Sequence, residues 1–120
     1  MDIFDVLADP VRRRILELIG AGEMTSGAVV KAIGCEFGIS QAAVSQHLKV
    51  LRESGFARVR AQAQKRLYSV DAAGPQAADA WIGQFRRFWE PKLDALETEI
   101  ARGRRQRRGA PTAGRAGRRA

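Results

Sequence analysis

The sequence is poor in the residues that build metal and redox sites. It contains one cysteine, Cys35, and one histidine, His47, among 120 residues. A single cysteine excludes an intrachain disulfide and a zinc site built from several thiolates, and a single histidine supplies few ligands for transition metals. A nucleophile with a partner base, a glycine-rich phosphate loop and a carboxylate pair in an apolar run are also missing. We therefore expect no cofactor, no metal and no enzymatic activity.

Long apolar segments are missing as well. No run of eighteen apolar residues occurs, so we expect no membrane span and no membrane partner. The first residues, Met1 to Asp5, lack the basic stretch followed by an apolar one that marks a secretory signal. The hydrophobic content of 45% and charged content of 28% are typical of an ordinary globular domain. These features predict a cytoplasmic protein.

Positive charge is concentrated in two segments. Eight of the 21 basic residues fall within 102–120, which has no acidic residue, so the remainder holds 13 residues of each sign. Within that remainder, residues 40–70 contain six basic residues and one acidic residue. A basic stripe on an otherwise acidic body is typical of a site for a polyanion. We expect residues 1–101 to form the folded domain and residues 102–120 a disordered, arginine-rich tail.

The remaining pattern predicts helices followed by a hairpin. Asp9 is placed to cap a helix that begins at Pro10, Thr25 or Ser26 to cap another, and Ser40 to cap a helix from Gln41 to about residue 54. Gly55 is suited to end that last helix in a left-handed conformation.

Two strands are predicted over 56–61 and 66–70. Because the connection 62–65 has no glycine, we expect a loose tip and not a tight two-residue turn. After a break at residues 74–75, a helix is predicted from residue 76 to about 100, kinked or divided at Pro91. The fold class is α+β, mostly α: a winged helix-turn-helix with a two-stranded wing.

The helix 41–54 has two unlike faces. At 100° per residue, Val44, Leu48 and Leu51 share one face, whereas the opposite face carries short polar groups and amides followed by cations. Such groups can reach base edges in the major groove of DNA, although a merely solvated face is the alternative. The residues expected to read or approach bases are Ser40, Gln41, Ala42, Ser45, Gln46 and Lys49. Those expected to neutralise phosphates are Arg52, Arg58, Arg60, Lys65 and Arg66.

Two stretches make the sequence similar to a known family. Residues 7–16 (LADPVRRRIL) and 38–55 (GISQAAVSQHLKVLRESG) resemble the ArsR family of bacterial repressors, and the similarity covers about residues 2–90. The chain looks most like its autoregulatory branch, which lacks known metal sites. The resemblance implies a homodimer joined through the first and the long C-terminal helices, residues 41–49 in the major groove, and the hairpin as a wing. The segment 28–37 is about one helical turn longer than is usual.

An aromatic stripe near the C-terminal end either lines a ligand site or forms a dimer interface. We favour the interface, because burying several aromatic rings offsets the ordering entropy of a small fold. The residues expected at the dimer interface are Phe4, Leu7, Trp81, Phe85, Phe88 and Trp89.

The predicted function is that of a homodimeric repressor that binds a pseudo-palindromic operator in double-stranded DNA, which could include its own promoter. Alternatives are a protein-interaction module and a ligand- or metal-responsive derepressor, and the sequence identifies no inducer. Cys35 is interpreted as a small buried hydrophobe in preference to a sensor. His47 is interpreted as a packing or phosphate-contacting residue.

Overall fold

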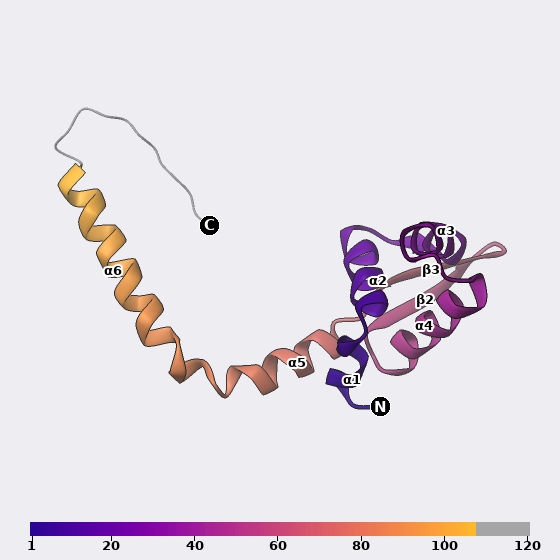
Figure 1. Ribbon diagram of the computed structural model, residues 1–120, viewed down its shortest axis with the longest axis horizontal. Coiled ribbons are helices and arrows are strands. Elements are labelled where there is room, and N and C mark those ends of the chain that lie inside the picture. Colours follow the sequence, from indigo (N-terminus) through magenta and orange to yellow (C-terminus); the bar gives the residue numbers. More distant parts are fainter. Residues whose placement is uncertain (108–120) are drawn as a thin grey trace. The chain divides into compact units, whose positions relative to one another are not determined.

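The computed structural model describes residues 1–107, without the side chains of 91–95 and 105–107. A first unit comprises Met1–Trp81 and a second begins at Ile82. Figure 1 shows the elements in chain order. They are α1 (Ile3–Ala8), α2 (Pro10–Ala21), β1 (Met24–Thr25), α3 (Ser26–Phe37), α4 (Gln41–Glu53), β2 (Ala57–Gln62), β3 (Lys65–Val70), α5 (Ala73–Gly83), the 3-10 helix η1 (Arg86–Phe88) and α6 (Glu90–Arg107).

Side chains cap the helices of the first unit where the sequence predicts. The Asp9 carboxylate accepts hydrogen bonds from the backbone N–H groups of Val11 (2.8 Å) and Arg12 (3.3 Å), and Pro10 is the first residue of α2. Thr25, one of two candidates, caps α3, and its hydroxyl accepts from Ala28 at 3.1 Å. The Ser40 hydroxyl accepts from the Ala43 N–H at 3.1 Å. Each cap satisfies a donor that the first helical turn leaves without a partner.

Left-handed glycines end the two central helices. Gly38 follows α3 with φ +66°, and its N–H donates to the Gly34 carbonyl at 2.9 Å. Gly55 follows α4 with φ +81°, which confirms its predicted role as a terminator. Both positions adopt a conformation that side chains with a Cβ disfavour. The turn from Gly38 to Ser40 therefore sets α4 apart from α3 and completes a helix-turn-helix.

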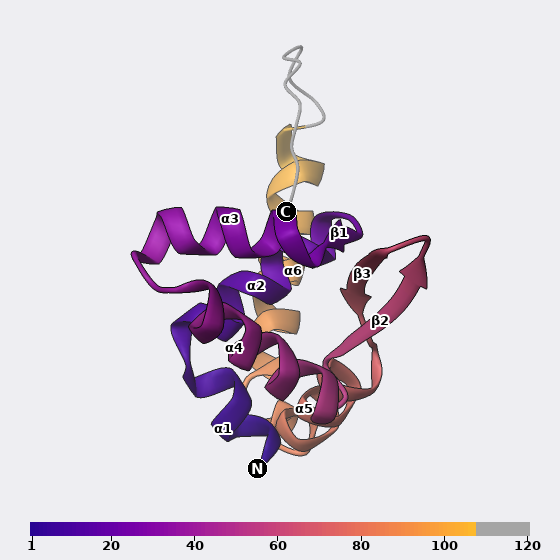
Figure 2. The same cartoon turned by 90° about the vertical axis from the view of Figure 1, so that its right-hand side faces the viewer.

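The strands form one antiparallel sheet with the order β1-β3-β2. Met24 and Thr25 pair with Tyr68 and Leu67, a third strand that the sequence pattern did not predict. The predicted two-stranded wing is present as β2 and β3, which pair from Ala57–Val70 to Gln62–Lys65. Figure 2 shows this hairpin extending beside α4.

The tip of the hairpin corrects one expectation. A loose connection over 62–65 is wrong, because Gln62 pairs with Lys65 and only Ala63 and Gln64 form the turn. Ala63 adopts φ +57°, the conformation that glycine would take more readily. Alanine enters this region at a cost of about 1–2 kcal/mol, which pairing along the whole length of both strands offsets.

Aliphatic side chains from α2, α3 and α4 form most of the core of the first unit. Val44, Leu48 and Leu51 are the buried residues of α4, as its periodicity predicts. The other members of the buried cluster come from α1, α2, α3, the sheet and the residue just before β2. They are Val6, Ile15, Ile19, Val29, Ile33, Phe56, Ala57 and Tyr68.

A tight corner joins the base of the wing to α5. The backbone N–H of Asp71 donates to the Phe56 carbonyl (2.9 Å), and that of Gly74 donates to the Gly55 carbonyl (2.7 Å). A Cβ on Gly74 would lie 2.5 Å from Cγ of the buried Phe56 ring. The break expected at residues 74–75 is therefore wrong: both residues belong to the first turn of α5, where a proline is tolerated.

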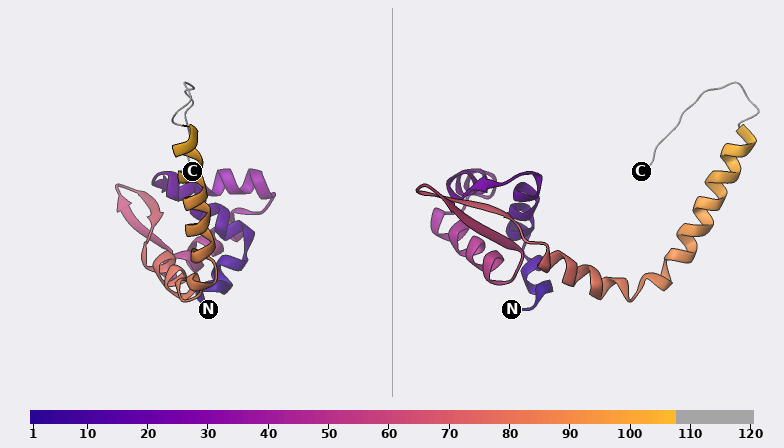
Figure 3. Two further views of the ribbon diagram at one scale, coloured as in Figure 1. Left: turned by 90° about the vertical axis from the view of Figure 1, so that its left-hand side faces the viewer. Right: turned by 180° about the vertical axis from the view of Figure 1, so that it is seen from behind.

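The helical segment after the wing is divided at another place than predicted. α5 ends at Gly83, η1 covers Arg86–Phe88, and α6 begins at Glu90 (Figure 3). Pro91 lies in the first turn of α6, where it interrupts no helix interior. The expected start of the disordered tail at Arg102 also shifts, because α6 continues to Arg107. The rest of that expected tail, 108–120, lies outside the described residues.

Candidate nucleic-acid interface

The outward face of α4 carries the predicted base-reading residues. Because Val44, Leu48 and Leu51 anchor one side of the helix in the core, the other side faces solvent. The predicted members are all exposed: Ser40, Gln41, Ala42, Ser45, Gln46 and Lys49. Ser40 also caps the helix, so its hydroxyl already accepts one hydrogen bond. The face offers hydroxyl and amide groups, which can donate to and accept from base edges.

Three cations gather in a hollow between α4 and the wing. The hollow is lined by Ser26, Ser45, Leu48, Lys49, Arg52, Arg66 and Tyr68. Arg66 reaches it because it leaves β3 on the same side as Tyr68, two residues along the strand. The lining contains three positive side chains, several hydroxyl groups and no carboxylate. Such a lining can hold an anionic oxygen, and it makes Lys49 a candidate for phosphate binding as well as for base contacts.

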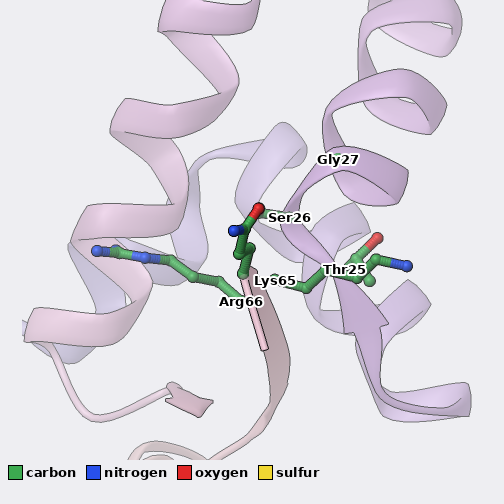
Figure 4. Close-up of a pocket in the computed structure, with 6 residues that line it drawn as sticks. Thr25, Ser26, Gly27, Lys65 and Arg66 are labelled. Carbon is green, nitrogen blue, oxygen red and sulfur yellow. The ribbon is translucent and has the colours of Figure 1, made fainter. Parts of the chain in front are cut away.

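A second hollow lies between the start of α3 and the tip of the wing. It is lined by Thr25, Ser26, Gly27, Gln64, Lys65 and Arg66. Figure 4 shows Lys65 and Arg66 leaving β3 in opposite directions. The two cations therefore extend the positive surface to both sides of the strand.

The other wing cations occupy the opposite side of the sheet from Arg66. In the register of the hairpin, Arg58 pairs with Ser69, and Arg60 pairs with Leu67, so Arg58, Arg60 and Lys65 lie on one face. The guanidinium of Arg60 donates to both carboxylate oxygens of Glu23, from Nε at 2.9 Å and from NH2 at 2.8 Å. The hydrogen bond from Arg60 lowers the pKa of Glu23, and the same bond raises the pKa of Arg60. Arg60 therefore differs from the other predicted wing contacts, Arg58, Lys65 and Arg66, in that a carboxylate already neutralises its charge.

His47 of α4 is in hydrogen-bond contact with Arg12 of α2. Arg12 donates from Nε to the Val6 carbonyl (3.0 Å) and from NH2 to the Asp5 carbonyl (2.9 Å), while its NH1 lies 3.3 Å from Nδ1 of His47. Because a guanidinium can only donate, Nδ1 is the acceptor, and the neutral ring carries its proton on Nε2. This contact ties α4 to α1 and α2, consistent with the packing interpretation of His47.

Asp9 is the acidic member of the same group. Desolvation, the largest single effect, acts to raise the pKa of Asp9. The backbone hydrogen bonds from Arg12 and Val11, together with the positive charge of Arg12, outweigh it and lower the pKa. The carboxylate thus remains charged at the start of α2, where the helix dipole also favours an anion.

The residues expected at a dimer interface leave much of their apolar surface uncovered. Trp81 is 52% exposed, although Phe4 packs edge-on against its ring at 5.1 Å. In the second unit Phe88 is 62% exposed and stacks on Phe85 at 6.3 Å. Trp89 is also exposed, whereas Leu7 is half-buried against the core of the first unit.

Two observations concern the alternatives in which a metal ion or the oxidation of Cys35 controls the protein. In the described part of the chain, no group of three or more His, Cys, Asp and Glu side chains lies close enough to hold a metal ion. Cys35 is exposed near the end of α3, so its interpretation as a buried hydrophobe is wrong. Its position in the last turn of α3 points it away from Val29 and Ile33, the buried residues of that helix.

Sequence reasoning missed the contributions of Ser26, Tyr68 and Glu23. Ser26 and Tyr68 line the hollow because β1 pairs with β3 beside α4, and Glu23 reaches Arg60 across 37 residues of sequence. A basic residue on a strand and an acid before a helix give no local signal of pairing. Only the strand order of the folded sheet brings these residues beside the predicted ones.

Comparisons with known proteins agree with this arrangement. Residues 7–60 match the family model described as a helix-turn-helix domain. The chain is 30% identical over 84 residues to the transcriptional repressor SdpR of Bacillus subtilis, which covers 70% of this chain and 89% of the relative. The crystal structure of the ArsR family transcriptional regulator RHA00566 is 28% identical, covers 73% of this chain and 87% of its own, and has a TM-score of 0.60. The chain belongs to the ArsR family of winged helix-turn-helix transcriptional regulators.

A third comparison extends the similarity of fold. The solution structure of Mb0332 from Mycobacterium bovis, described as a homodimeric winged helix-turn-helix DNA-binding domain, is 21% identical with a TM-score of 0.52. It covers 95% of this chain and 84% of its own. In the part of this ArsR-family regulator that the structure describes, none of the helices combines the length and the apolar character of a membrane span.

Proposed function

We propose that this ArsR-family regulator is a repressor whose homodimer binds a pseudo-palindromic DNA operator and blocks transcription from it. The observation that carries the proposal is the face of α4. Its exposed short polar side chains lie beside a hollow lined by Lys49, Arg52 and Arg66. Repression is supported by the similarity to SdpR, a transcriptional repressor.

In the proposed complex α4 enters the major groove. Gln46 and Ser45, near the middle of the exposed face, then contact base edges, where glutamine can form two hydrogen bonds with adenine. The hollow holds a backbone phosphate, and Arg58 and Lys65 contact phosphates along the wing. Regulation of its own promoter is part of the proposal, supported by the resemblance to the autoregulatory branch of the family.

A homodimer would cover the exposed aromatic surface. Trp81 in the first unit and Phe88 and Trp89 in the second are each exposed, and exposed apolar surface commonly marks an interface. The similar protein Mb0332 is described as homodimeric. A two-fold axis would place two copies of α4 about 34–36 Å apart, in successive major grooves. Light scattering at micromolar concentration should give the mass of a dimer, and a monomer would contradict this part of the proposal.

Base reading is tested by selecting duplexes with the purified protein and measuring mobility shifts on the selected sequence and on random DNA. Gln46→Ala should cost about 1–3 kcal/mol on the selected sequence, at one base position per half-site. Gln76→Ala is the matched control, because Gln76 is an exposed amide on α5 away from the interface. Equal weakening by Gln46→Ala on both DNAs would show that α4 does not read the bases.

A further inference from the structure

Arg60 differs from the neighbouring wing cations because it already has an anionic partner. Its guanidinium and the Glu23 carboxylate form two parallel hydrogen bonds of 2.9 and 2.8 Å, the geometry in which these groups bind most strongly. Arg58 lies on the same face of β2, two residues away, and within the described part of the chain its side chain makes no hydrogen bond or ion pair.

The ion pair spans the full width of the sheet. Leu67 of β3 pairs on one side with Thr25 of β1 and on the other with Arg60 of β2. Glu23 directly precedes β1, so the Arg60 side chain passes over β3 to reach it. β1 has only two residues, and so few backbone hydrogen bonds hold it that a side-chain link adds substantially to its attachment.

We infer that Arg60 is a positioning residue, which fixes the wing against the segment before α3 through Glu23, and that it is not a phosphate contact. This inference rests on the proposed DNA binding and corrects the role that the charge pattern predicts for Arg60. The pair has no net charge, so the entry of DNA releases few counterions there. The link also sets the distance between the wing and Ser26 at the start of α3, and therefore the shape of the hollow that takes a phosphate.

The first test removes the pair without changing the net charge. Each phosphate contact contributes about −0.9 to the slope of log affinity against log salt concentration. The double variant Glu23→Ala, Arg60→Ala should keep the wild-type slope on a random duplex, whereas Arg58→Ala should reduce its magnitude by about 0.9. A loss of about 0.9 in the double variant as well would overturn the inference.

The second test exchanges the two charges. In Glu23→Arg, Arg60→Glu the link can re-form with opposite polarity, so affinity for a selected duplex should return to within about threefold of the wild type. Arg60→Glu alone leaves two carboxylates facing each other and should bind clearly more weakly. If position 60 contacts a phosphate, the exchanged variant will bind at least as weakly as Arg60→Glu, because it places a carboxylate against the DNA.

A third measurement needs no DNA and separates this inference from the proposed function. Glu23→Ala and Arg60→Ala should each lower the Tm by about 1–4 °C, and the double variant should lower it by no more than either single change. Hydrogen exchange in β1 should accelerate in all three variants. Additive Tm losses, or unchanged exchange in β1, would overturn the link even if the wild type bound no operator. A wild type that binds no DNA while these results hold would instead refute the proposed function.

Discussion

The two units of the chain use their hydrophobic residues in opposite ways. In Met1–Trp81 aliphatic side chains of α2, α3 and α4 pack together in a buried core, and Ile33 is 0% exposed. In the described part of the second unit the large apolar side chains remain at the surface, and Ile100 is 43% exposed. The comparison shows that the first unit contains a closed core of its own. The second unit offers apolar surface that another molecule can cover.

The sharpest test of this comparison replaces one isoleucine in each unit. Ile33→Ala should lower the free energy of unfolding by about 2–5 kcal/mol, because it leaves a cavity in a close-packed core. Ile100→Ala should change it by less than about 0.5 kcal/mol, measured by urea unfolding at a concentration where the protein is monomeric. Equal losses at both positions would show that α6 belongs to the same core.

A pair of glycines provides the next test. Gly74→Ala should cost about 1–3 kcal/mol, because the new Cβ would lie within 2.7 Å of three atoms of the buried Phe56 ring. At Gly83 the nearest heavy atom to a new Cβ is Nε of Arg86, at 3.4 Å, and this side chain is flexible. Gly83→Ala should therefore leave the unfolding midpoint nearly unchanged. Full stability of Gly74→Ala would mean that the corner can open without cost.

An acidic residue at the start of a helix should contribute more to stability in the first unit than in the second. Asp9→Ala removes the cap of α2 and should cost about 0.5–2 kcal/mol, whereas Glu90→Ala at the first residue of α6 should cost little. Because the pKa of Asp9 is lowered in the folded protein, its charge stabilises the fold above its ordinary pKa, about 3.9. This contribution is lost as the pH falls through the folded value. Asp9→Asn should flatten the pH dependence of the unfolding free energy below pH 4, and an unchanged profile would contradict this.

The smallest effect is expected at the tip of the wing, and it is stabilising. Ala63 has φ +57°, so Ala63→Gly should relieve the left-handed strain and raise stability by about 0.5–1 kcal/mol after the greater entropy of the unfolded chain is counted. The same change at Ala101, inside α6, should have no stabilising effect. Circular dichroism melts of both variants give the comparison, and destabilisation by Ala63→Gly would contradict the strained turn.

The sequence predicted those features that depend on neighbouring residues. The period of Val44, Leu48 and Leu51 oriented α4, and Ser40 and Gly55 marked its ends. These signals are local, because burial of one helical face and the caps of its ends need only the residues of that helix. The exposed residues of the candidate interface followed from the same orientation.

Features that depend on partners distant in the chain could not be predicted. The strand β1 has two residues and exists only because Tyr68 and Leu67 lie beside it. The pairing of Arg60 with Glu23 depends on the sheet order, and the turn at Ala63 depends on the pairing that forces it. Tertiary contacts override local preference at each of these places. The number of positive charges alone therefore predicts phosphate binding for every cation of the wing, including Arg60.

The corner at the base of the wing has a mechanical consequence. The hairpin begins after Phe56 and ends before Asp71, and the hydrogen bond between these two residues closes its base. A six-residue strand extends about 20 Å from that base, so the hairpin acts as a lever with a short pivot. A tilt of about 5° at the corner would carry the tip through roughly 2 Å, more than the tolerance of a hydrogen bond. Small changes in packing around Gly74 would thus be magnified at the tip of the wing, where we propose that Lys65 contacts a phosphate.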